Sequence, residues 1–338
     1  MFAVIDCGTT FTRIFIVDDR QRIVASGDKK VGVRDTSITG SRDKLRNGVA
    51  ELFFDVLSQN NIPSDAVEYA IASGMITSEV GLIEIPHLVA PIGKNELSEG
   101  ILEVEDQSVL PLGRPIYFIR GVRNNYAKNA RVQNLHEIDF MRGEEVQCVG
   151  ILQDSSVQVP CNIVALSSHT KVMYIDEQSR IAACNTTISG QFYEALVNST
   201  NIGKSIVHTD DEEAGGYSRE EIIEIAADCV KRSGLGRTML MPRFMQVLLK
   251  TNSDERNLFV NAAIAADDLL AFEEIRDRGY KSDRYILYGH RSRCELYEEM
   301  LKDHFGPQLQ IRLIYERDEI SELTVRGVIA IALKKINH

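Results

Sequence analysis

The first residues with chemical potential are an acid, a glycine and two threonines at the end of a short apolar run. Residues 2–5 are apolar and partly β-branched, which predicts a buried strand that ends at Asp6. Gly8, Thr9 and Thr10 follow, and they predict a tight turn before a second apolar run. Glycine lets a backbone approach a phosphate closely, and successive N–H groups in a tight turn bind anions.

The carboxylate of Asp6 adds a second kind of chemistry to this turn. A carboxylate at a strand end can hold Mg²⁺, directly or through water, because Mg²⁺ prefers oxygen ligands and keeps several waters. An ordinary hairpin with a polar tip explains the same residues, so the spacing alone leaves both interpretations open.

A second group of acids lies in residues 138–152, which read IDFMRGEEVQCVGIL. We expect Asp139 to cap a helix that starts near Phe140. Glu144 and Glu145 then fall in its first turns, where the helix dipole favours anions. A well-capped connecting helix explains these acids, and a general base that accepts a proton from a substrate hydroxyl is the alternative.

The elements that position these residues follow from the hydrophobic pattern. Three strands up to residue 30, a helix over 43–59 and a strand over 69–72 give the order β-β-β-α-β. From Asn162 the layout of apolar run, hydroxyl-rich turn and apolar run is repeated, with Ser167, Ser168, His169 and Lys171 in the turn. This repetition predicts a duplicated architecture with a phosphate turn in each half.

The rest of the chain is predicted as connections, helices and strands. Connections without landmarks are expected over 93–115 and 124–138, and an acidic surface connection is expected over 208–216. Helices are expected over 190–199, 218–233, 242–252, 254–278, 293–304 and 319–336, and strands over 116–120, 285–288 and 311–315.

Composition excludes several classes of protein. The 338 residues carry a net charge of −11, which argues against nonspecific nucleic-acid binding. The six cysteines are scattered without a CxxC pair, so neither a zinc site nor a redox motif is expected, and a reducing compartment fits. We expect no signal peptide and no apolar run of about 20 residues. The predicted location is the cytoplasm.

Three strings resemble one known family. They are IDCGTTFTRIFIVD at the N-terminus, SGMITSEVGLIEIPHLVAP over 73–91 and MRGEEVQ over 141–147. They resemble the 2-dehydro-3-deoxygalactonokinases of the actin, sugar-kinase and Hsp70 superfamily. The resemblance implies an α/β fold of two ribonuclease-H-like (actin-like ATPase) domains, each of β-β-β-α-β-α topology, flanking an interdomain cleft. We place the domains at 1–154 and 155–338.

The resemblance also implies an activity and a division of roles. The family transfers the γ-phosphate of ATP to the C6 hydroxyl of 2-dehydro-3-deoxy-D-galactonate in galactonate catabolism, with Mg²⁺. Asp6 is implied as the metal ligand, and either Asp139 or Glu144 as the base, with Asp139 preferred. The implied ATP-binding residues are Asp6, Gly8, Thr9, Thr10, Arg13, Ser168, His169, Lys171 and Gly289. The implied sugar-binding residues are Ser78, Gly81, Arg142 and Glu145.

Several positions depart from the family pattern. They are Leu82, Ser167, Gln191, Ala262 and Ala266. They support an alternative in which the chain is a sensor that binds a sugar acid or nucleotide with little or no transfer, or a kinase for a different sugar acid. The expected partners are ATP and a small sugar acid, without nucleic acid or membrane, and a homodimer stays open.

Overall fold

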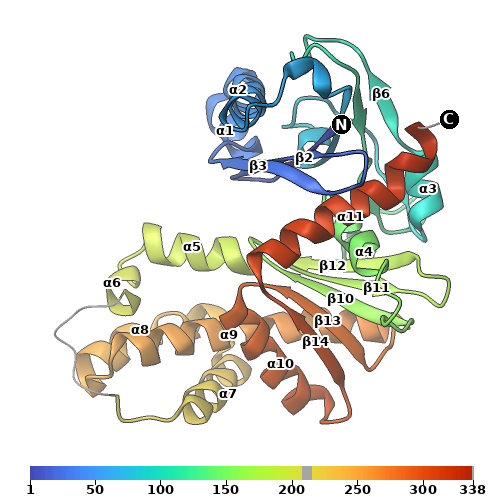
Figure 1. Ribbon diagram of the computed structural model, residues 1–338. Helices are drawn as coiled ribbons and strands as arrows, with labels where there is room; N and C mark the ends of the chain where they lie inside the picture. The colour runs from blue at the N-terminus through green and yellow to red at the C-terminus, as the bar shows by residue number, and fades with distance from the viewer. Residues whose placement is uncertain (208–214, 337–338) are drawn as a thin grey trace. The chain divides into compact units, whose positions relative to one another are not determined.

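The structure is a computed structural model, and it describes residues 1–207 and 215–336 apart from the side chains of residues 333 and 334. The chain divides into two compact units, each with its own large sheet (Figure 1). The first unit comprises residues 1–160, 175–184 and 317–338, and the second comprises 161–174 and 185–316. Most of the acidic connection predicted over 208–216 lies outside the described residues.

The first unit is built on a six-stranded sheet in the order β3-β2-β1-β4-β7-β6. Its strands are β1 (Phe2–Cys7), β2 (Thr12–Val17), β3 (Ile23–Lys29), β4 (Tyr69–Gly74), β6 (Leu102–Val104) and β7 (Ile116–Phe118). The central strand β1 pairs antiparallel with β2 and parallel with β4. The side chains of β1 other than Asp6 are buried, so the unbroken apolar run 2–5 became the expected core strand.

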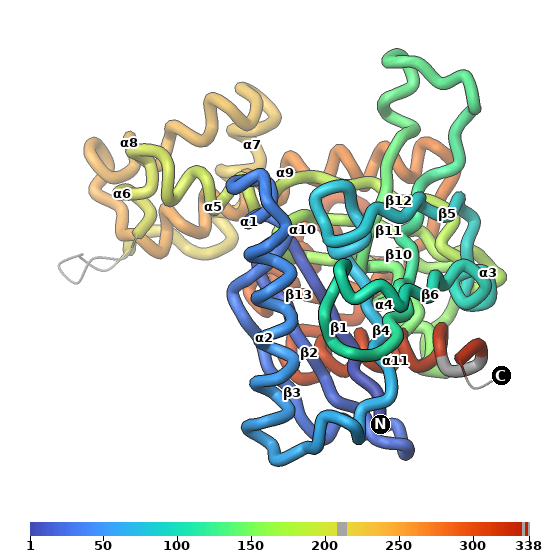
Figure 2. Tube along the Cα trace, turned by 90° about the horizontal axis from the view of Figure 1, so that it is seen from above, coloured from blue at the N-terminus to red at the C-terminus, as the bar shows by residue number. Residues whose placement is uncertain are grey.

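Helices and a small second sheet complete the first unit. The helices are α1 (Val33–Thr39), α2 (Asp43–Gln59), α3 (Lys94–Glu99), α4 (Glu144–Ile151) and α11 (Arg317–Ile336), and a three-stranded sheet joins β5 (Leu88–Val89), β8 (Val122–Arg123) and β9 (Phe140–Met141). Short 3₁₀ turns occupy Ser64–Ala66, Met75–Thr77 and Val132–Glu137. Helix α2 lies along β2 and β3 (Figure 2) and buries its apolar stripe against them.

Two glycines let α4 and α11 pack closely in this unit. A Cβ added to Gly150 of α4 would lie 2.0 Å from the carbonyl oxygen of Leu323, and one added to Gly327 of α11 would lie 2.0 Å from that of Val146. Any larger residue at either position would therefore push the two helices apart. This packing matters for the site because α4 begins at Glu144.

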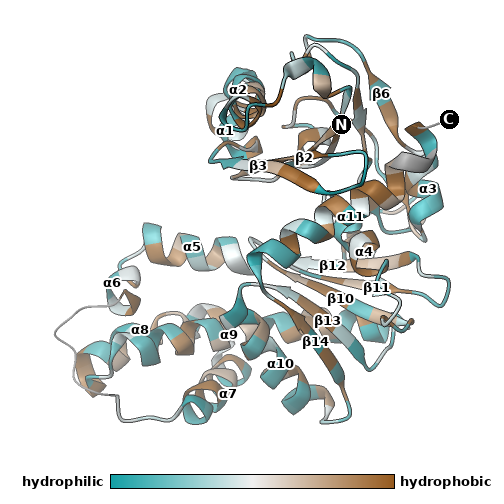
Figure 3. Ribbon diagram, viewed as in Figure 1, coloured by the Kyte–Doolittle hydropathy of each residue, from teal (hydrophilic) through white to brown (hydrophobic). Residues whose placement is uncertain are grey.

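The second unit has a five-stranded sheet in the order β12-β11-β10-β13-β14. Its strands are β10 (Cys161–Leu166), β11 (Thr170–Ile175), β12 (Ile181–Thr187), β13 (Arg284–Gly289) and β14 (Gln310–Ile314), with the linked ends 175–184 of β11 and β12 counted in the first unit. Strands β10 and β13 pair in parallel, as do β13 and β14. β10 and β13 are mainly hydrophobic (Figure 3), and every residue of β10 is buried.

The helices of the second unit are α5 (Ser189–Ser199), α6 (Gly203–Ile206), α7 (Arg219–Thr238), α8 (Met241–Phe244), α9 (Ser253–Asp277) and α10 (Arg291–Phe305). Gly234, with φ 74°, breaks the helical backbone inside α7. A π-helical segment over Met245–Leu249 follows α8. No helix among the described residues combines the length and apolar character needed to cross a bilayer.

The two sheets confirm the predicted duplication. In both, three consecutive strands lie in reverse order, and two later strands continue in parallel beyond the first: β4 and β7 in one sheet, β13 and β14 in the other. The predicted helices over 43–59, 190–199 and 254–278 are confirmed within a residue or two. The connection predicted over 93–115 is wrong, because it contains α3 and β6, and α1 was not predicted. The helices α1 and α3 have only seven and six residues, which is less than two helical turns. A helical repeat of apolar residues cannot be recognised over so short a segment.

The predicted helix start near Phe140 is also wrong. Phe140 and Met141 form the strand β9, and the helix begins at Glu144 after Gly143. Gly143 has φ 111°, a conformation that L-residues with side chains avoid, and a Cβ added there would lie 3.3 Å from the Cα of Gly74. Asp139 therefore lies before a short strand and does not cap a helix.

Candidate functional site

In the first unit, Asp6 lies at the end of β1 between two neighbouring strands. It is paired with Arg13 of β2 and with Ser73 of β4. Its side chain is 17% exposed, and its Oδ2 lies 3.6 Å from Nη1 of Arg13. Burial raises the pKa of Asp6, the Arg13 guanidinium opposes that rise, and the nearby Glu144 carboxylate adds to it. The fold thus buries the Asp6 carboxylate at a position where Arg13 only partly stabilises its negative charge.

The turn after Asp6 is held through its carbonyl oxygens. The N–H of Gly8 donates to the carbonyl of Phe11 at 2.9 Å, and the N–H of Arg34 at the start of α1 donates to the carbonyl of Thr9 at 2.9 Å. Within the described residues, the hydroxyls of Thr9 and Thr10 have no hydrogen-bond partner, and both residues are only partly buried. The turn therefore has two hydroxyls that no described residue engages.

Glu144, the first residue of α4, approaches the same acid. Its carboxylate is close enough to Asp6 to raise the pKa of that residue. Its Oε2 is sealed from solvent and has no hydrogen-bond partner in the described part of the chain, and the same holds for Oγ of Ser73. Unpartnered buried polar atoms are costly unless a ligand or ion completes them. Two acids and a hydroxyl thus lie near one another, and the Arg13 guanidinium partly offsets their negative charge.

Asp139, the other candidate base, lies in the segment that leads into β9. Its carbonyl oxygen accepts the N–H of Asn124 at 2.8 Å, and its Oδ1 accepts the N–H of Phe140 at 2.6 Å. The side chain is half-buried. The structure brings Glu144 together with Asp6 and places Asp139 in a different local setting.

The four residues implied for sugar binding are buried and hydrogen-bonded inside the first unit. Ser78 donates to the carbonyl of Met75 at 2.7 Å, and Arg142 donates to Oγ1 of Thr77 and to the carbonyl of Ile85, both at 2.8 Å. Glu145 is fully buried and accepts the N–H of Gly143 at 2.8 Å. A Cβ on Gly81 would lie 2.2 Å from the carbonyl oxygen of Ile76. These contacts shape the 75–85 loop and anchor it to the start of α4.

In the second unit, the predicted second turn lies between β10 and β11. The carbonyl of Ser168 accepts the N–H of Gln191 at the start of α5 at 2.8 Å. Oγ of Ser168 lies 3.1 Å from Nδ1 of His169. Lys171 is 5% exposed within β11. Gly289 ends β13 against β10, and a Cβ there would lie 2.2 Å from the carbonyl oxygen of Leu166. Glycine is therefore required at this close approach of two strands.

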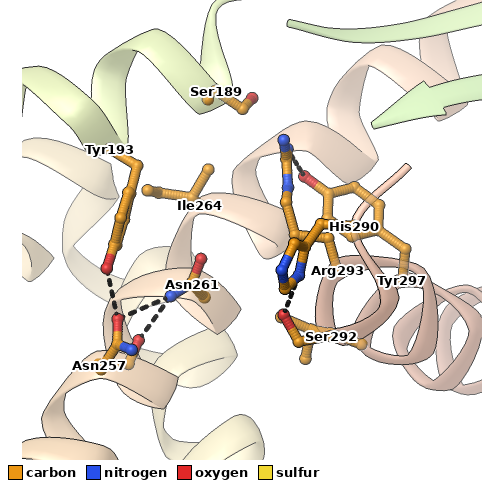
Figure 4. Close-up of a pocket in the computed structure, with 11 residues that line it drawn as sticks. Ser189, Tyr193, Asn257, Asn261, Ile264, His290, Ser292, Arg293 and Tyr297 are labelled. Atoms are coloured by element: carbon orange, nitrogen blue, oxygen red, sulfur yellow. Dashed lines mark hydrogen bonds between the residues drawn. The ribbon is translucent and has the colours of Figure 1, made fainter. Parts of the chain in front are cut away.

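A cavity of about 270 Å³ lies beside this turn, within the second unit. The starts of α5 and α10 and one face of α9 line it (Figure 4). The lining residues are Ser189, Gly190, Tyr193, Asn257, Asn261, Ile264, His290, Ser292, Arg293, Leu296 and Tyr297. Gly190 also packs on the turn, since a Cβ there would lie 2.2 Å from the carbonyl oxygen of Ser167. The second turn thus packs against Gly190, which lines the cavity.

The cavity has two chemically distinct ends. At one end the hydroxyl of Tyr193 donates to Oδ1 of Asn257 at 2.7 Å, and Nδ2 of Asn261 donates to the main-chain oxygen of Asn257 at 2.9 Å (Figure 4). At the other end lie His290 and Arg293, at the start of α10. The first end offers an aromatic ring and amides, and the second offers positive charge and a helix N-terminus, which attracts anions.

Sequence reasoning missed most residues of this cavity. The sequence does contain a signal, because Asn257 and Asn261 lie four residues apart on a helix whose other face is apolar and small. Tyr193, Arg293 and Tyr297 come from other elements far along the chain, so their convergence depends on tertiary structure.

Comparisons with known proteins agree on the fold. A protein from Sinorhizobium meliloti, described provisionally as a 2-dehydro-3-deoxygalactonokinase, has a structure that matches with a TM-score of 0.71 at 16% identity, over 98% of this chain and 99% of that one. The ethanolamine utilization protein EutJ from Carboxydothermus hydrogenoformans matches with a TM-score of 0.50 at 13% identity, over 98% and 89% of the two chains. No curated protein matches the chain.

These likenesses and the duplicated sheet order confirm the predicted α/β fold with two domains of related topology. The sequence pattern of the family described as 2-keto-3-deoxy-galactonokinase matches residues 6–328. A kinase family of this kind implies a small sugar acid and ATP as substrates. The chain belongs to the 2-keto-3-deoxy-galactonokinase family and is a carbohydrate kinase of the sugar-acid type.

Proposed function

We propose that this protein transfers the γ-phosphate of ATP to the C6 hydroxyl of 2-dehydro-3-deoxy-D-galactonate with Mg²⁺. The observation that carries the proposal is that Glu144, whose buried Oε2 has no partner among the described residues, is near enough to Asp6 to raise its pKa, beside a turn whose threonine hydroxyls have no partner there either. Phosphoryl transfer requires mainly positioning and charge neutralisation, and this arrangement supplies both donors and acids.

The residues around Asp6 fit a bound Mg²⁺. Mg²⁺ takes one or two carboxylates and keeps waters and phosphate oxygens as its other ligands. Asp6 and the nearby Glu144 offer that number of acids. We assign Asp6 as the ligand. A bound Mg²⁺ would supply charge neutralisation for the phosphates. Thr9 and Thr10 would contribute hydroxyl donors, and Gly8 would let the backbone approach the phosphates closely.

Between the two candidate bases, the contacts favour Glu144. It lies beside Asp6, where the transferred phosphate would bind, and its Oε2 has no competing partner in the described residues. A base needs an open lone pair within reach of the acceptor hydroxyl. Asp139 already accepts a hydrogen bond from the N–H of Phe140. Glu144 would accept the proton of the sugar hydroxyl, and Asp139 stays the alternative.

We propose that the cavity of the second unit binds the nucleoside of ATP. At about 270 Å³ it is slightly smaller than the usual range of small-molecule sites, roughly 300–1,000 Å³, so it would hold part of ATP. The ring of Tyr193 and the amides of Asn257 and Asn261 suit a nucleobase, whereas His290 and Arg293 suit phosphate. This polarity directs the phosphates toward the turn that holds Ser168 and His169.

The sugar acid would bind in the first unit near the 75–85 loop. The buried Ser78, Gly81, Arg142 and Glu145 are proposed to shape this site through the contacts described above. His87 and the exposed Phe140 lie against each other, with ring centroids 5.0 Å apart, close to the start of α4. An aromatic surface of this kind packs against the C–H face of a sugar-derived chain.

The test is a coupled assay of ADP release with purified protein, ATP and Mg²⁺. The panel contains 2-dehydro-3-deoxygalactonate, its gluconate epimer, and hexonates without the 2-keto group. The proposal expects the galactonate derivative to give the highest kcat/KM. Preference for another acid would change the assigned substrate. ADP release that no acid stimulates, together with tight nucleotide binding, would favour the sensor alternative.

A further inference from the structure

A buried polar cluster lies behind the cavity of the second unit. It consists of Thr170, Ser189, Asp268, Arg293 and Tyr297, which come from four different elements. Asp268, on α9, is 2% exposed and does not line the cavity, whereas Ser189, Arg293 and Tyr297 do. None of the residues predicted from the sequence accounts for this acid, and the proposed mechanism does not use it.

Asp268 joins two walls of the cavity. Its carboxylate accepts the hydroxyl of Ser189, the first residue of α5, at 2.5 and 2.6 Å. It also accepts the hydroxyl of Tyr297, on α10, at 2.5 Å. These are short, charge-assisted hydrogen bonds, which are roughly twice as strong as neutral ones. The side chain of Asp268 therefore links α9 to α5 and to α10, and all three helices line the cavity.

The cluster extends from Tyr297 to the positive end of the cavity. Nη2 of Arg293 donates to Oγ1 of Thr170 at 2.9 Å and to the hydroxyl of Tyr297 at 3.4 Å. Nη1 of Arg293 donates to the carbonyl of Ser167 at 2.5 Å. The guanidinium is thus held between α10 and the second turn, facing the cavity it lines (Figure 4).

The acid fixes the direction of these hydrogen bonds. An ionised carboxylate only accepts, so the hydroxyl of Tyr297 must donate to Asp268 and can then only accept from Arg293 or Thr170. Burial and the neighbouring Asp268 raise the pKa of Tyr297, which keeps the hydroxyl protonated. An amide at position 268 would have the same shape, but its NH₂ group donates hydrogen bonds, so the side chain could no longer accept at both of its polar atoms.

We propose that Asp268 is a positioning residue that holds Arg293 and the start of α5 in place for the nucleotide. The inference rests on the proposed binding of a nucleoside and its phosphates in this cavity. It assigns Asp268 an effect on nucleotide affinity, not on sugar affinity or on the chemical step.

The experiment measures ADP binding by calorimetry, and the KM values of ATP and sugar acid, for wild type, Asp268→Asn, Tyr297→Phe and the double variant. We expect each single variant to weaken ADP binding about ten- to a hundredfold, the range for one lost hydrogen bond to a charged group. The sugar-acid KM should change less than about twofold. The double variant should match the weaker single variant, because residues that act as one unit are not additive.

Tyr285→Phe is the matched control. Tyr285 is as buried as Tyr297, lies in the same unit, and its hydroxyl accepts Nη1 of Arg276 at 3.3 Å outside the cavity. It should lower the melting temperature without changing ADP affinity. Equal loss of ADP affinity in Tyr285→Phe and Tyr297→Phe, unchanged affinity in Asp268→Asn, or multiplying effects in the double variant would overturn the inference alone. Wild-type protein that binds no nucleotide would overturn the proposed function and this inference with it.

Discussion

The turns after β1 and β10 occupy the same place in two copies of one topology, yet they differ in chemistry. Both are held through their carbonyl oxygens by the helix that follows the third strand, by Arg34 of α1 in one and Gln191 of α5 in the other. The last-but-one residue of β1 is Asp6, whereas the last-but-one residue of β10 is Ala165. Duplication preserved the backbone frame and left only the first copy with an acid.

The side chains around the two turns also differ in charge. Beside the first turn, the acid Glu144 raises the pKa of Asp6 and the cation Arg13 lowers it. The second adjoins the guanidinium of Arg293 and a cavity that contains amides and an aromatic ring. We infer that the first copy supplies charge for the reaction and the second supplies position for the nucleotide. Substitutions in the first should therefore lower kcat, and those in the second should raise the nucleotide KM.

The largest effect is expected at the acid that only the first copy has. Asp6→Asn should lower kcat by about a thousandfold or more, because a bound cation stabilises the transition state by several kcal/mol. Burial raises the pKa of Asp6, so the charged form is disfavoured in the folded protein, and removing the charge should leave the metal-free melting temperature at pH 7 equal or higher. A variant with normal turnover would show that Asp6 is only a turn residue.

The next effect concerns the base. Glu144→Gln should reduce kcat about 10²–10⁴-fold, the usual range for general-base assistance, with ADP affinity nearly unchanged. Asp139→Asn serves as the comparison and should cost less than about tenfold. Steady-state kinetics and ADP titration on both variants decide between them. The reverse order would assign the base to Asp139, and near-normal turnover of both would place it elsewhere.

In the second copy, Arg293→Met should act on the nucleotide. Loss of the guanidinium should raise the Kd of ADP about ten- to a hundredfold, while the KM of the sugar acid stays within about twofold. Arg291→Met is a suitable control, because Arg291 is exposed and pairs with Glu295 at 2.8 Å without lining the cavity. A loss confined to kcat would contradict the division of roles between the two copies.

The smallest effects come from removing one hydroxyl in each turn. Thr9→Val and Ser168→Ala should each cost about two- to tenfold, which is the range for one neutral hydrogen bond. The first should appear mainly in kcat and the second mainly in the ATP KM. Full kinetic curves for both variants test this, and identical patterns would show that the turns share one role.

The sequence predicted the parts of the molecule that depend on local pattern. Strands such as β1 and β10, the helices α2 and α9, and the turn between β1 and β2 follow from apolar periodicity and from the IDCGTT string. The start of α4 did not follow, because the helix begins only after Gly143, whose φ of 111° the apolar pattern does not reveal. The cavity did not follow either, since Tyr193, Asn257 and Arg293 are brought together by tertiary contacts alone.

The most direct test of the central claim is the identity of the phosphorylated product. Wild-type protein is incubated with ATP, Mg²⁺ and 2-dehydro-3-deoxygalactonate, and proton-coupled ³¹P NMR follows the reaction. We predict a phosphate monoester resonance split by the two protons of C6, formed in step with ADP and absent with Asp6→Asn. Inorganic phosphate as the sole phosphorus product besides ADP, or no reaction with any sugar acid, would contradict the account.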